Sequence, residues 1–184
     1  MLPIKGLGKR TEEAREEMGS YNEGKLEVVE WVKQNFPKGS TCLDVGACDG
    51  KWWNLLGDYL KMDCVEIFKP NVYEHDLMNK YEKVFVNDVA NFRYAWYDLI
   101  IFGDVLEHMP VEKAQAVLKY AEPRCKDLVI GIPFLYTQGA IYGNPWEEHI
   151  QNDLTPELFD ERYPGYELII RPMWEYAYYH KGEI

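Results

Sequence analysis

Short apolar segments alternate with amphipathic segments along most of this 184-residue chain. Alternating strands and helices predict a parallel sheet with helices on both faces. Two further strands, expected over residues 166–171 and 174–180, stand close together and should form an antiparallel hairpin. The sequence therefore predicts an α/β fold with a seven-stranded, mainly parallel sheet. The other five strands are expected over residues 41–46, 62–68, 83–87, 98–102 and 127–132.

The length of the chain fits one domain. We expect an N-terminal extension over residues 1–24, with a short helix, followed by a single domain over residues 25–184. No run approaches the roughly 18 apolar residues that a membrane span needs, and residues 1–10 contain no continuous apolar stretch, so no signal peptide is predicted. The four cysteines show no CxxC spacing, which favours free thiols and a cytoplasmic compartment.

The charge balance of the chain is acidic, with 31 acidic residues, 20 basic residues and a formal net charge of −11. Proteins that bind the phosphate backbone of nucleic acids usually present a clustered basic face. No block of positive charge stands out in this sequence. The composition therefore favours a small-molecule partner over a nucleic acid.

A glycine-containing loop, Asp44-Val-Gly-Ala-Cys-Asp-Gly50, follows the first predicted strand and precedes a predicted helix. Glycine lets the backbone turn sharply there and approach a ligand that a Cβ atom would block. In a parallel sheet, ligands bind beyond the carboxyl ends of the strands. Glu66 ends the second strand, where a carboxylate can accept hydrogen bonds from two ribose hydroxyls. Asp88 follows the third strand, where it can reach an adenine ring.

The loop resembles the first motif of class I S-adenosylmethionine-dependent methyltransferases, D/E-x-G-x-G-x-G, with Cys48 in place of the middle glycine. The resemblance covers residues 25–180 and implies S-adenosylmethionine as the cofactor. It also implies a Rossmann-like sheet with the strand order 3-2-1-4-5-7-6 and strand 7 antiparallel. By this resemblance Asp44 and Gly46 line the methionine end, Glu66 binds the ribose and Asp88 binds the adenine. The cofactor-binding residues expected in all are Asp44, Gly46, Ala47, Cys48, Gly50, Glu66, Asp88 and Asp104.

Acidic residues and histidines follow the fourth predicted strand, at Asp104, Glu107 and His108, and His149 lies in a later loop. If residues 104–108 form a helical turn, the i, i+3 and i+4 spacing places the first three on one face. Such residues are ligands for a divalent metal, here Mg or Mn, which would hold two adjacent oxygens of an acceptor and lower its hydroxyl pKa. The pattern is similar to that of the metal-dependent small-RNA 2′-O-methyltransferases and the ubiquinone-pathway O-methyltransferases.

The same residues allow two other interpretations. In a metal-free site, His108 or His149 would be the catalytic base that takes a proton from the acceptor, because imidazole titrates near neutral pH. In the other interpretation the residues pack under the cofactor and have a structural role alone.

A long segment over residues 133–155, rich in glycine, proline and aromatic residues, is expected to be a loop. Long irregular loops in compact domains tend to be functional. We expect it to form a substrate lid, with Tyr136, Tyr142 and Trp146 against the acceptor. The alternative is a packed surface loop with aromatic anchors.

These features predict an S-adenosylmethionine-dependent methyltransferase that acts on an oxygen or nitrogen of a small molecule, such as a sugar or another hydroxylated metabolite. A metal-assisted RNA 2′-O-methyltransferase is the second hypothesis. A regulatory module that binds S-adenosylmethionine without catalysis is the third.

Overall fold

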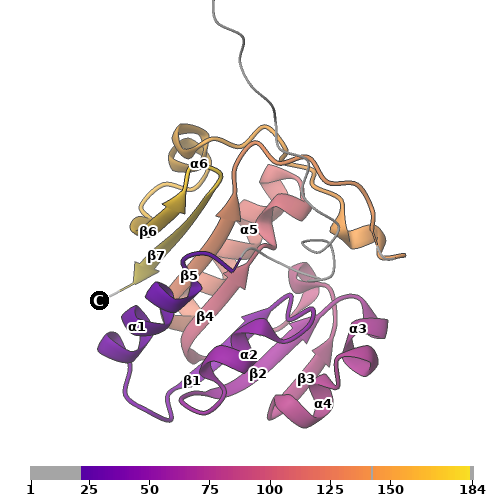
Figure 1. The fold of residues 1–184 in the computed structure, drawn as a ribbon, viewed down its shortest axis with the longest axis vertical. Coiled ribbons are helices and arrows are strands. Elements are labelled where there is room, and N and C mark those ends of the chain that lie inside the picture. The colour runs from indigo at the N-terminus through magenta and orange to yellow at the C-terminus, as the bar shows by residue number, and fades with distance from the viewer. Residues whose placement is uncertain (1–21, 142, 183–184) are drawn as a thin grey trace, which may run out of the picture.

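The computed structural model describes residues 22–141 and 143–182. Its seven-stranded sheet has the order β3-β2-β1-β4-β5-β7-β6 (Figure 1). The strands are β1 (Thr41–Val45), β2 (Lys61–Glu66), β3 (Lys83–Val86), β4 (Tyr97–Gly103), β5 (Cys125–Pro133), β6 (Glu167–Met173) and β7 (Tyr176–Gly182). β7 is antiparallel to both of its neighbours, and the other pairs are parallel. The expected Rossmann-like strand order and the orientation of β7 are confirmed.

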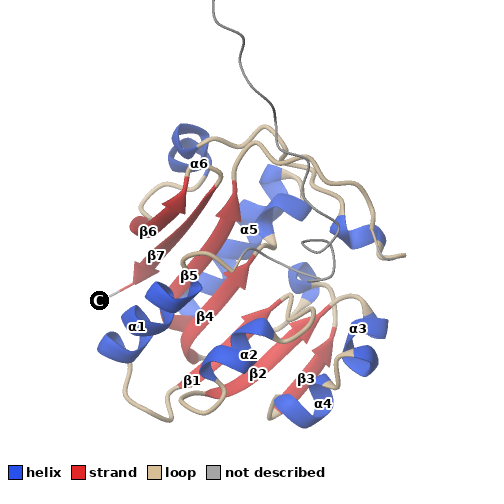
Figure 2. Ribbon diagram, viewed as in Figure 1, coloured by secondary structure: helices blue, strands red, loops and turns tan. Residues whose placement is uncertain are grey.

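Helices cover both faces of the sheet (Figure 2). The α-helices are α1 (Lys25–Asn35), α2 (Lys51–Leu56), α3 (Lys69–Glu74), α4 (Leu77–Lys80), α5 (Val111–Ala121) and α6 (Pro156–Arg162). Short 3-10 turns are η2 (Val89–Asn91), η3 (Leu106–His108), η4 (Glu122–Arg124) and η5 (Pro145–Glu147). None of the helices in the described part of the chain has the length and apolarity that a membrane span requires.

The hydrophobic core has two layers, one on each face of the sheet. In β4, Ile100 and Phe102 pack with the side chains of α5 and α6, whereas Leu99 and Ile101 pack with those of α1 and α2. Successive strand residues point to opposite faces, so a strand that is covered on both faces must be apolar at every position. This packing holds the carboxyl ends of β1, β2 and β4 along one edge of the sheet, where the site described below is formed.

The C-terminal hairpin forms as expected, but its turn lies elsewhere. β6 continues through Met173, which pairs with Tyr176, so the turn contains Trp174 and Glu175 rather than Pro172 and Met173. Proline lacks the N–H group that a central strand needs, but an edge strand tolerates it. Because β6 is the edge of the sheet, Pro172 does not end the strand.

Two expectations fall on residues outside the described part of the chain. The short helix expected in the N-terminal extension falls on residues 1–21, which the structure does not describe, and Tyr142 is also not described. α1 begins at Lys25, where the single domain was expected to start. The division into an extension and a domain stays a prediction.

Candidate active site

A cavity of about 1360 Å³ opens at the carboxyl ends of β1, β2 and β4. Its walls come from the loop after β1, the ends of β2 and β3, the turn after β4, and the segment that joins β5 to α6. We call residues 136–141 and 143–150 of that segment the strap. Parallel α/β sheets bind their ligands at this edge, so the cavity is the candidate active site.

The loop between β1 and α2 turns tightly along one wall of the cavity. Gly46 has a φ of 71°, and a Cβ atom there would lie 2.7 Å from Cγ2 of Val105. Cys48 has a φ of 47°, so it adopts the left-handed conformation that glycine adopts most easily. Gly50 precedes α2 with a φ of 80°. The loop therefore follows a glycine-like path although a cysteine stands at its centre.

Glu66 joins this loop to the end of β2. One carboxylate oxygen accepts the N–H of Cys48 at 2.8 Å, and the other accepts the N–H of Phe68 at 2.7 Å. Burial raises the pKa of Glu66, and these backbone hydrogen bonds oppose the shift. A carboxylate oxygen can accept more than one hydrogen bond. Because Glu66 lines the cavity, it can bind two further donors from a ligand.

Asp88 and Asp44 occupy different positions. Asp88 lines the cavity, accepts the N–H of Ala90, and forms an ion pair with Nζ of Lys113 at 2.9 Å. Asp44 is buried below the loop and accepts a hydrogen bond from the hydroxyl of Tyr81. Burial raises the pKa of Asp44 to about 7. Asp44 and Gly50 are outside the cavity lining. They can influence the cavity only by setting the conformation of the loop between them. Of the expected cofactor-binding residues, those that line the cavity are Gly46, Ala47, Cys48, Glu66, Asp88 and Asp104.

The turn after β4 differs from the expected helical turn. The 3-10 turn η3 begins at Leu106, and Asp104 precedes it with a left-handed φ of 55°. The expectation that Asp104 shares a helical face with Glu107 and His108 was therefore wrong, because a left-handed residue cannot continue a right-handed helix. Asp104 lines the cavity, but the group of clustered ligand atoms does not include it.

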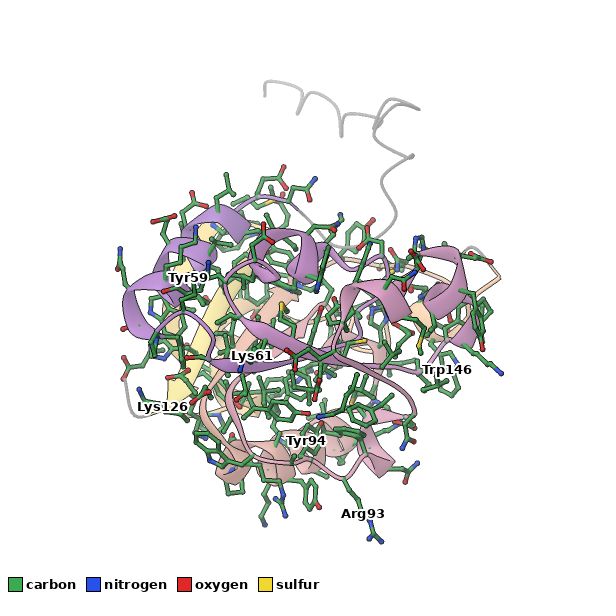
Figure 3. All side chains as sticks on the ribbon, turned by 90° about the horizontal axis from the view of Figure 1, so that it is seen from below. Tyr59, Lys61, Arg93, Tyr94, Lys126 and Trp146 are labelled. Carbon is green, nitrogen blue, oxygen red and sulfur yellow. The ribbon has the colours of Figure 1, made fainter. Side chains whose placement is uncertain are left out.

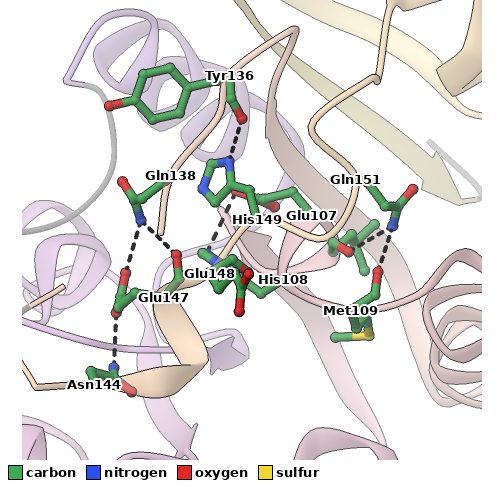
Figure 4. A network of polar contacts seen from close by, with 11 residues as sticks. Glu107, His108, Met109, Tyr136, Gln138, Asn144, Glu147, Glu148, His149 and Gln151 are labelled. Atoms are coloured by element: carbon green, nitrogen blue, oxygen red, sulfur yellow. Dashed lines mark hydrogen bonds and ion pairs between the residues drawn. The ribbon is translucent and has the colours of Figure 1, made fainter. Parts of the chain in front are cut away.

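Glu107, His108 and His149 form a cluster whose ligand atoms all lie within 4.8 Å of one another (Figure 4). Nδ1 of His108 lies 3.2 Å from the carbonyl oxygen of Glu148, and Nδ1 of His149 lies 2.9 Å from that of Tyr136. A carbonyl oxygen can only accept, so both Nδ1 atoms carry the hydrogen and both Nε2 atoms keep a lone pair. Metal-bound histidines usually show this arrangement.

The carboxylate of Glu107 is fully buried in this cluster, and neither of its oxygens has a hydrogen-bond partner within the described part of the chain. Burial, together with the nearby carboxylate of Asp104, raises the pKa of Glu107 well above its usual range. Buried polar groups in proteins are nearly always paired, and an exception needs an explanation. A cation bound by the cluster would supply the missing partner.

Gln151 fixes the cluster in place. Its side-chain amide donates to the carbonyl oxygens of Leu106 at 2.8 Å and Met109 at 3.1 Å. The backbone N–H groups of Ile150 and Gln151 donate to the carbonyl oxygen of Glu107 at 2.7 and 3.0 Å. These contacts hold the end of the strap against the turn after β4. Gln151 is not predictable from the sequence, because its partners are about 40 residues away and no local pattern marks it.

Glu147 is a second residue of the site that was not among the residues expected from the sequence. Its carboxylate accepts a hydrogen bond from Nδ2 of Asn144 at 3.0 Å, and its carbonyl oxygen accepts one from Nε2 of Gln138 at 2.9 Å (Figure 4). Burial, followed by the carboxylate of Glu66, raises the pKa of Glu147. A local signal existed, since an asparagine three residues before a glutamate is typical of the start of a helical turn.

Aromatic side chains of the strap border the cavity near the cluster. The ring of Tyr136 lies edge-on to the ring of His149, with the centroids 5.3 Å apart. Trp146 lines the cavity and is 49% exposed. Figure 3 shows Trp146 at the edge of the molecule. Two of the three residues expected to contact the acceptor therefore lie at the cavity, and Tyr142 is outside the described residues.

The sequence matches no family model and no curated protein. Solved structures match over nearly the whole chain. An S-adenosylmethionine-dependent methyltransferase from Clostridium acetobutylicum has a TM-score of 0.68 at 12% identity, over 90% of this chain and 94% of that chain. A TehB-like S-adenosylmethionine-dependent methyltransferase from Corynebacterium glutamicum has a TM-score of 0.62 at 15% identity, over 86% and 88% of the two chains.

Magnesium protoporphyrin IX methyltransferase from Synechocystis, solved with bound S-adenosylmethionine, has a TM-score of 0.54 at 17% identity. That match covers 88% of this chain and 84% of the other. Identities this low establish the architecture and not the reaction. The chain has the fold of the class I S-adenosylmethionine-dependent methyltransferases.

Proposed function

We propose that the protein transfers a methyl group from S-adenosylmethionine to a hydroxyl oxygen of a small molecule. The observation that carries this proposal is the cavity itself, which combines a tightly turned loop after β1 with the carboxylate of Glu66 at the end of β2. One structural neighbour with the same fold was solved with S-adenosylmethionine bound.

The residues around the loop fit this cofactor. Gly46 permits the tight left-handed turn after β1, Glu66 has lone pairs for two ribose hydroxyls, and Asp88 lines the cavity with its charge balanced by Lys113. S-adenosylmethionine supplies a methyl group on a sulfonium, so the reaction needs mainly alignment of the acceptor. The task of the chain is therefore to hold the two reactants in line and to exclude water.

Glu107, His108 and His149 fit a divalent cation, because they combine an unpartnered buried carboxylate with two Nε2 lone pairs. Two imidazoles and one carboxylate suit manganese better than magnesium, which prefers oxygen ligands. A bound divalent cation lowers the pKa of a coordinated hydroxyl group. This favours an oxygen acceptor over a nitrogen acceptor, since an amine would not need that activation.

The charge of the cavity favours a small acceptor over RNA. Carboxylates outnumber lysines among the lining residues, and one of the lysines, Lys113, is bound by Asp88. A negative lining repels a polyanion such as RNA. The acidic lining residues are Glu23, Asp49, Glu66, Asp88, Asp104, Glu107, Glu147 and Glu148, and the lysines are Lys51 and Lys113.

Calorimetric titration with S-adenosylhomocysteine tests the cofactor site. We expect saturable binding by the wild type, and a loss of about 1 to 3 kcal/mol in Glu66→Ala, the usual range for hydrogen bonds to a charged acceptor. Glu74→Ala, an exposed residue of α3, is the matched control and should bind as the wild type does. A wild-type protein that binds neither S-adenosylmethionine nor S-adenosylhomocysteine would contradict the proposal.

A turnover assay distinguishes an enzyme from a regulatory module that only binds the cofactor. Release of S-adenosylhomocysteine from S-adenosylmethionine should depend on a hydroxylated small molecule and on Mn²⁺. Tight cofactor binding without turnover over a broad panel of acceptors would instead support the non-catalytic hypothesis. Full activity in a strong chelator would support the metal-free site.

A further inference from the structure

We infer that the acceptor is a hydroxylated molecule with an apolar body, rather than a sugar or another polyol. The inference rests on the proposed function and deepens it, because it assigns a chemical class to the molecule that receives the methyl group. The feature that carries it is an apolar surface of the strap. This surface consists of Ile141, Trp146 and Ile150, which all line the cavity, and we call it the platform.

The platform is exposed although it lies in a cavity. Trp146 is 49% exposed and Ile150 is 48% exposed, and Ile141 is half-buried. A single exposed apolar side chain is ordinary on a protein surface. Here two large ones stand four positions apart in the sequence and line one cavity. Apolar surface gathered in this way marks a ligand-binding site, since a ligand with an apolar body would remove it from water.

Backbone hydrogen bonds hold the platform in a defined position. The N–H of Trp146 donates to the side-chain oxygen of Asn144 at 3.0 Å, and the N–H of Asn144 donates to the carbonyl oxygen of Ile141 at 2.8 Å. The N–H of Ile150 donates to the carbonyl oxygen of Glu107 at 2.7 Å. A surface that is fixed before binding loses little conformational entropy when the ligand arrives. The platform is therefore ready to bind an apolar group.

The amide side chains of the strap are already used within the strap. Nε2 of Gln138 donates to the carbonyl oxygen of Glu147 at 2.9 Å, and Nδ2 of Asn144 donates to the carboxylate of Glu147 at 3.0 Å (Figure 4). A sugar needs hydrogen-bond partners for hydroxyl groups along its whole length, because each buried group without a partner costs free energy. The donors of these amides are not free for that purpose. The strap therefore favours apolar contact over the recognition of a polyol.

The hydroxyl end of such an acceptor has a place beside the platform. His149 precedes Ile150 in the chain, and its Nε2 atom keeps a lone pair, as does that of His108. The cluster and the platform are thus neighbouring parts of one wall. The cavity of about 1360 Å³ exceeds the roughly 300 to 1,000 Å³ of a site for one ligand, so it has room for this acceptor beside the cofactor.

Calorimetry with a series of catechols tests the inference. Catechol and its 4-methyl, 4-ethyl, 4-propyl and 4-butyl derivatives share two adjacent hydroxyl groups and differ only in the apolar tail. They are titrated into protein that is saturated with S-adenosylhomocysteine. In the wild type each added methylene should tighten the Kd by about three- to fourfold, the usual gain from burying one such group. Glucose, which lacks an apolar body, should bind more weakly than 4-butylcatechol.

Variants of the platform show where the tail binds. In Trp146→Ala and in Ile150→Ala, each methylene should tighten the Kd by less than about twofold, because less apolar surface is left to cover. Trp146→Phe keeps an aromatic ring and should keep most of the dependence on tail length. Trp96→Ala is the matched control, since Trp96 is 59% exposed and lies outside the cavity lining, and it should keep the full dependence. The affinity for S-adenosylhomocysteine should not change in any of them.

The outcomes separate the inference from the proposed function. A wild-type Kd that does not change with tail length would overturn the inference, as would tighter binding of glucose than of 4-butylcatechol, or the full dependence in both alanine variants. If an alanine variant does not fold, as judged by its thermal midpoint, Ile150→Thr decides, because it keeps the branched shape and removes apolar surface. Binding of S-adenosylhomocysteine without binding of any catechol would overturn the inference alone. Failure of the wild type to bind S-adenosylhomocysteine would instead overturn the proposed function.

Discussion

Two non-glycine residues with left-handed backbone border the cavity, namely Cys48 with a φ of 47° and Asp104 with a φ of 55°. Such a conformation costs of order 1 to 3 kcal/mol per residue, and it persists only where the surrounding structure enforces it. At Cys48 the enforcing contact is the hydrogen bond from its N–H to Glu66. Backbone strain of this kind is often found at functional sites.

Replacement of Cys48 tests that strain. Cys48→Val should lower the free energy of unfolding by about 1 to 3 kcal/mol, because a β-branched side chain is poorly tolerated at positive φ. Cys48→Gly is the control and should unfold at nearly the wild-type denaturant midpoint, since glycine adopts this conformation without strain. Equal midpoints for the two variants in chemical denaturation would show that position 48 is not strained.

Asp44 gives a prediction about pH. Burial raises its pKa in the folded state to about 7, above the ordinary value of 3.8, so folding favours the protonated form. Its contribution to stability is therefore present below about pH 4 and is lost as the pH rises through 7. Asp44→Asn, which cannot ionise, should be more stable than the wild type at pH 8 by a few kcal/mol, with the difference vanishing near pH 4.

Urea unfolding from pH 4 to pH 8 measures this difference. Asp58→Asn, an exposed residue near the end of α2, is the control and should follow the wild type at every pH. A constant difference between Asp44→Asn and the wild type across this range would contradict the assigned cause.

At the scale of elements, the strap and the turn after β4 work as one unit. Gln151 and two backbone N–H groups hold the end of the strap to that turn, and His149 thereby stays beside Glu107. β4 supplies the turn and the segment between β5 and α6 supplies the strap. Neither element contains the cluster alone, so its geometry depends on their contact.

Gln151→Ala tests that contact. The substitution leaves buried carbonyl oxygens without a donor, so the free energy of unfolding should fall by about 2 to 4 kcal/mol. The affinity for Mn²⁺ should also fall, whereas the affinity for S-adenosylhomocysteine should change little, because the loop after β1 is untouched. Gln115→Ala removes one exposed hydrogen bond on α5 and should change none of these by much. Wild-type affinity for Mn²⁺ in Gln151→Ala would show that the bond does not position the cluster.

At the scale of the whole molecule, the strands of the sheet could be predicted because each strand is marked by a pattern of neighbouring residues in the sequence. Continuous apolar runs indicated strands that are covered on both faces, and these proved to be β1, β2, β4 and β5. Helix ends are set by single backbone conformations that composition does not mark, as at Asp76, whose left-handed φ of 53° separates α3 from α4. The edge position of β6, which tolerates Pro172, depends on topology and not on nearby sequence.

The candidate site was less predictable, because its parts come from distant segments. The glycine loop and Glu66 follow from a local motif and from spacing. Asp44 lies outside the cavity lining, and a motif does not show which carboxylates face a ligand and which lie beneath it. Gln151 could not be found, since only the folded chain brings it to Leu106 and Met109.

Metal binding should stabilise the whole molecule. A ligand that binds only the folded state at about 100 times its Kd adds about 2.7 kcal/mol, which for a chain of this size raises Tm by roughly 5 to 10 °C. We expect Mn²⁺ to raise the Tm of the wild type in scanning calorimetry and a chelator to reverse the change. His149→Ala should lose the response, and His75→Ala, outside the cluster, should keep it. A wild-type Tm that ignores Mn²⁺ would argue against the cation.

The buried carboxylate of Glu107 has a consequence for directed evolution. A desolvated carboxylate without a hydrogen-bond partner in the described part of the chain lowers the stability of the apoprotein, so leucine or glutamine at position 107 should raise that stability. A library selected for survival of heating without added manganese would then be enriched in such replacements. Such variants should have lost the proposed metal-dependent methyl transfer. A selection for thermal stability in this protein therefore needs a second round that measures turnover.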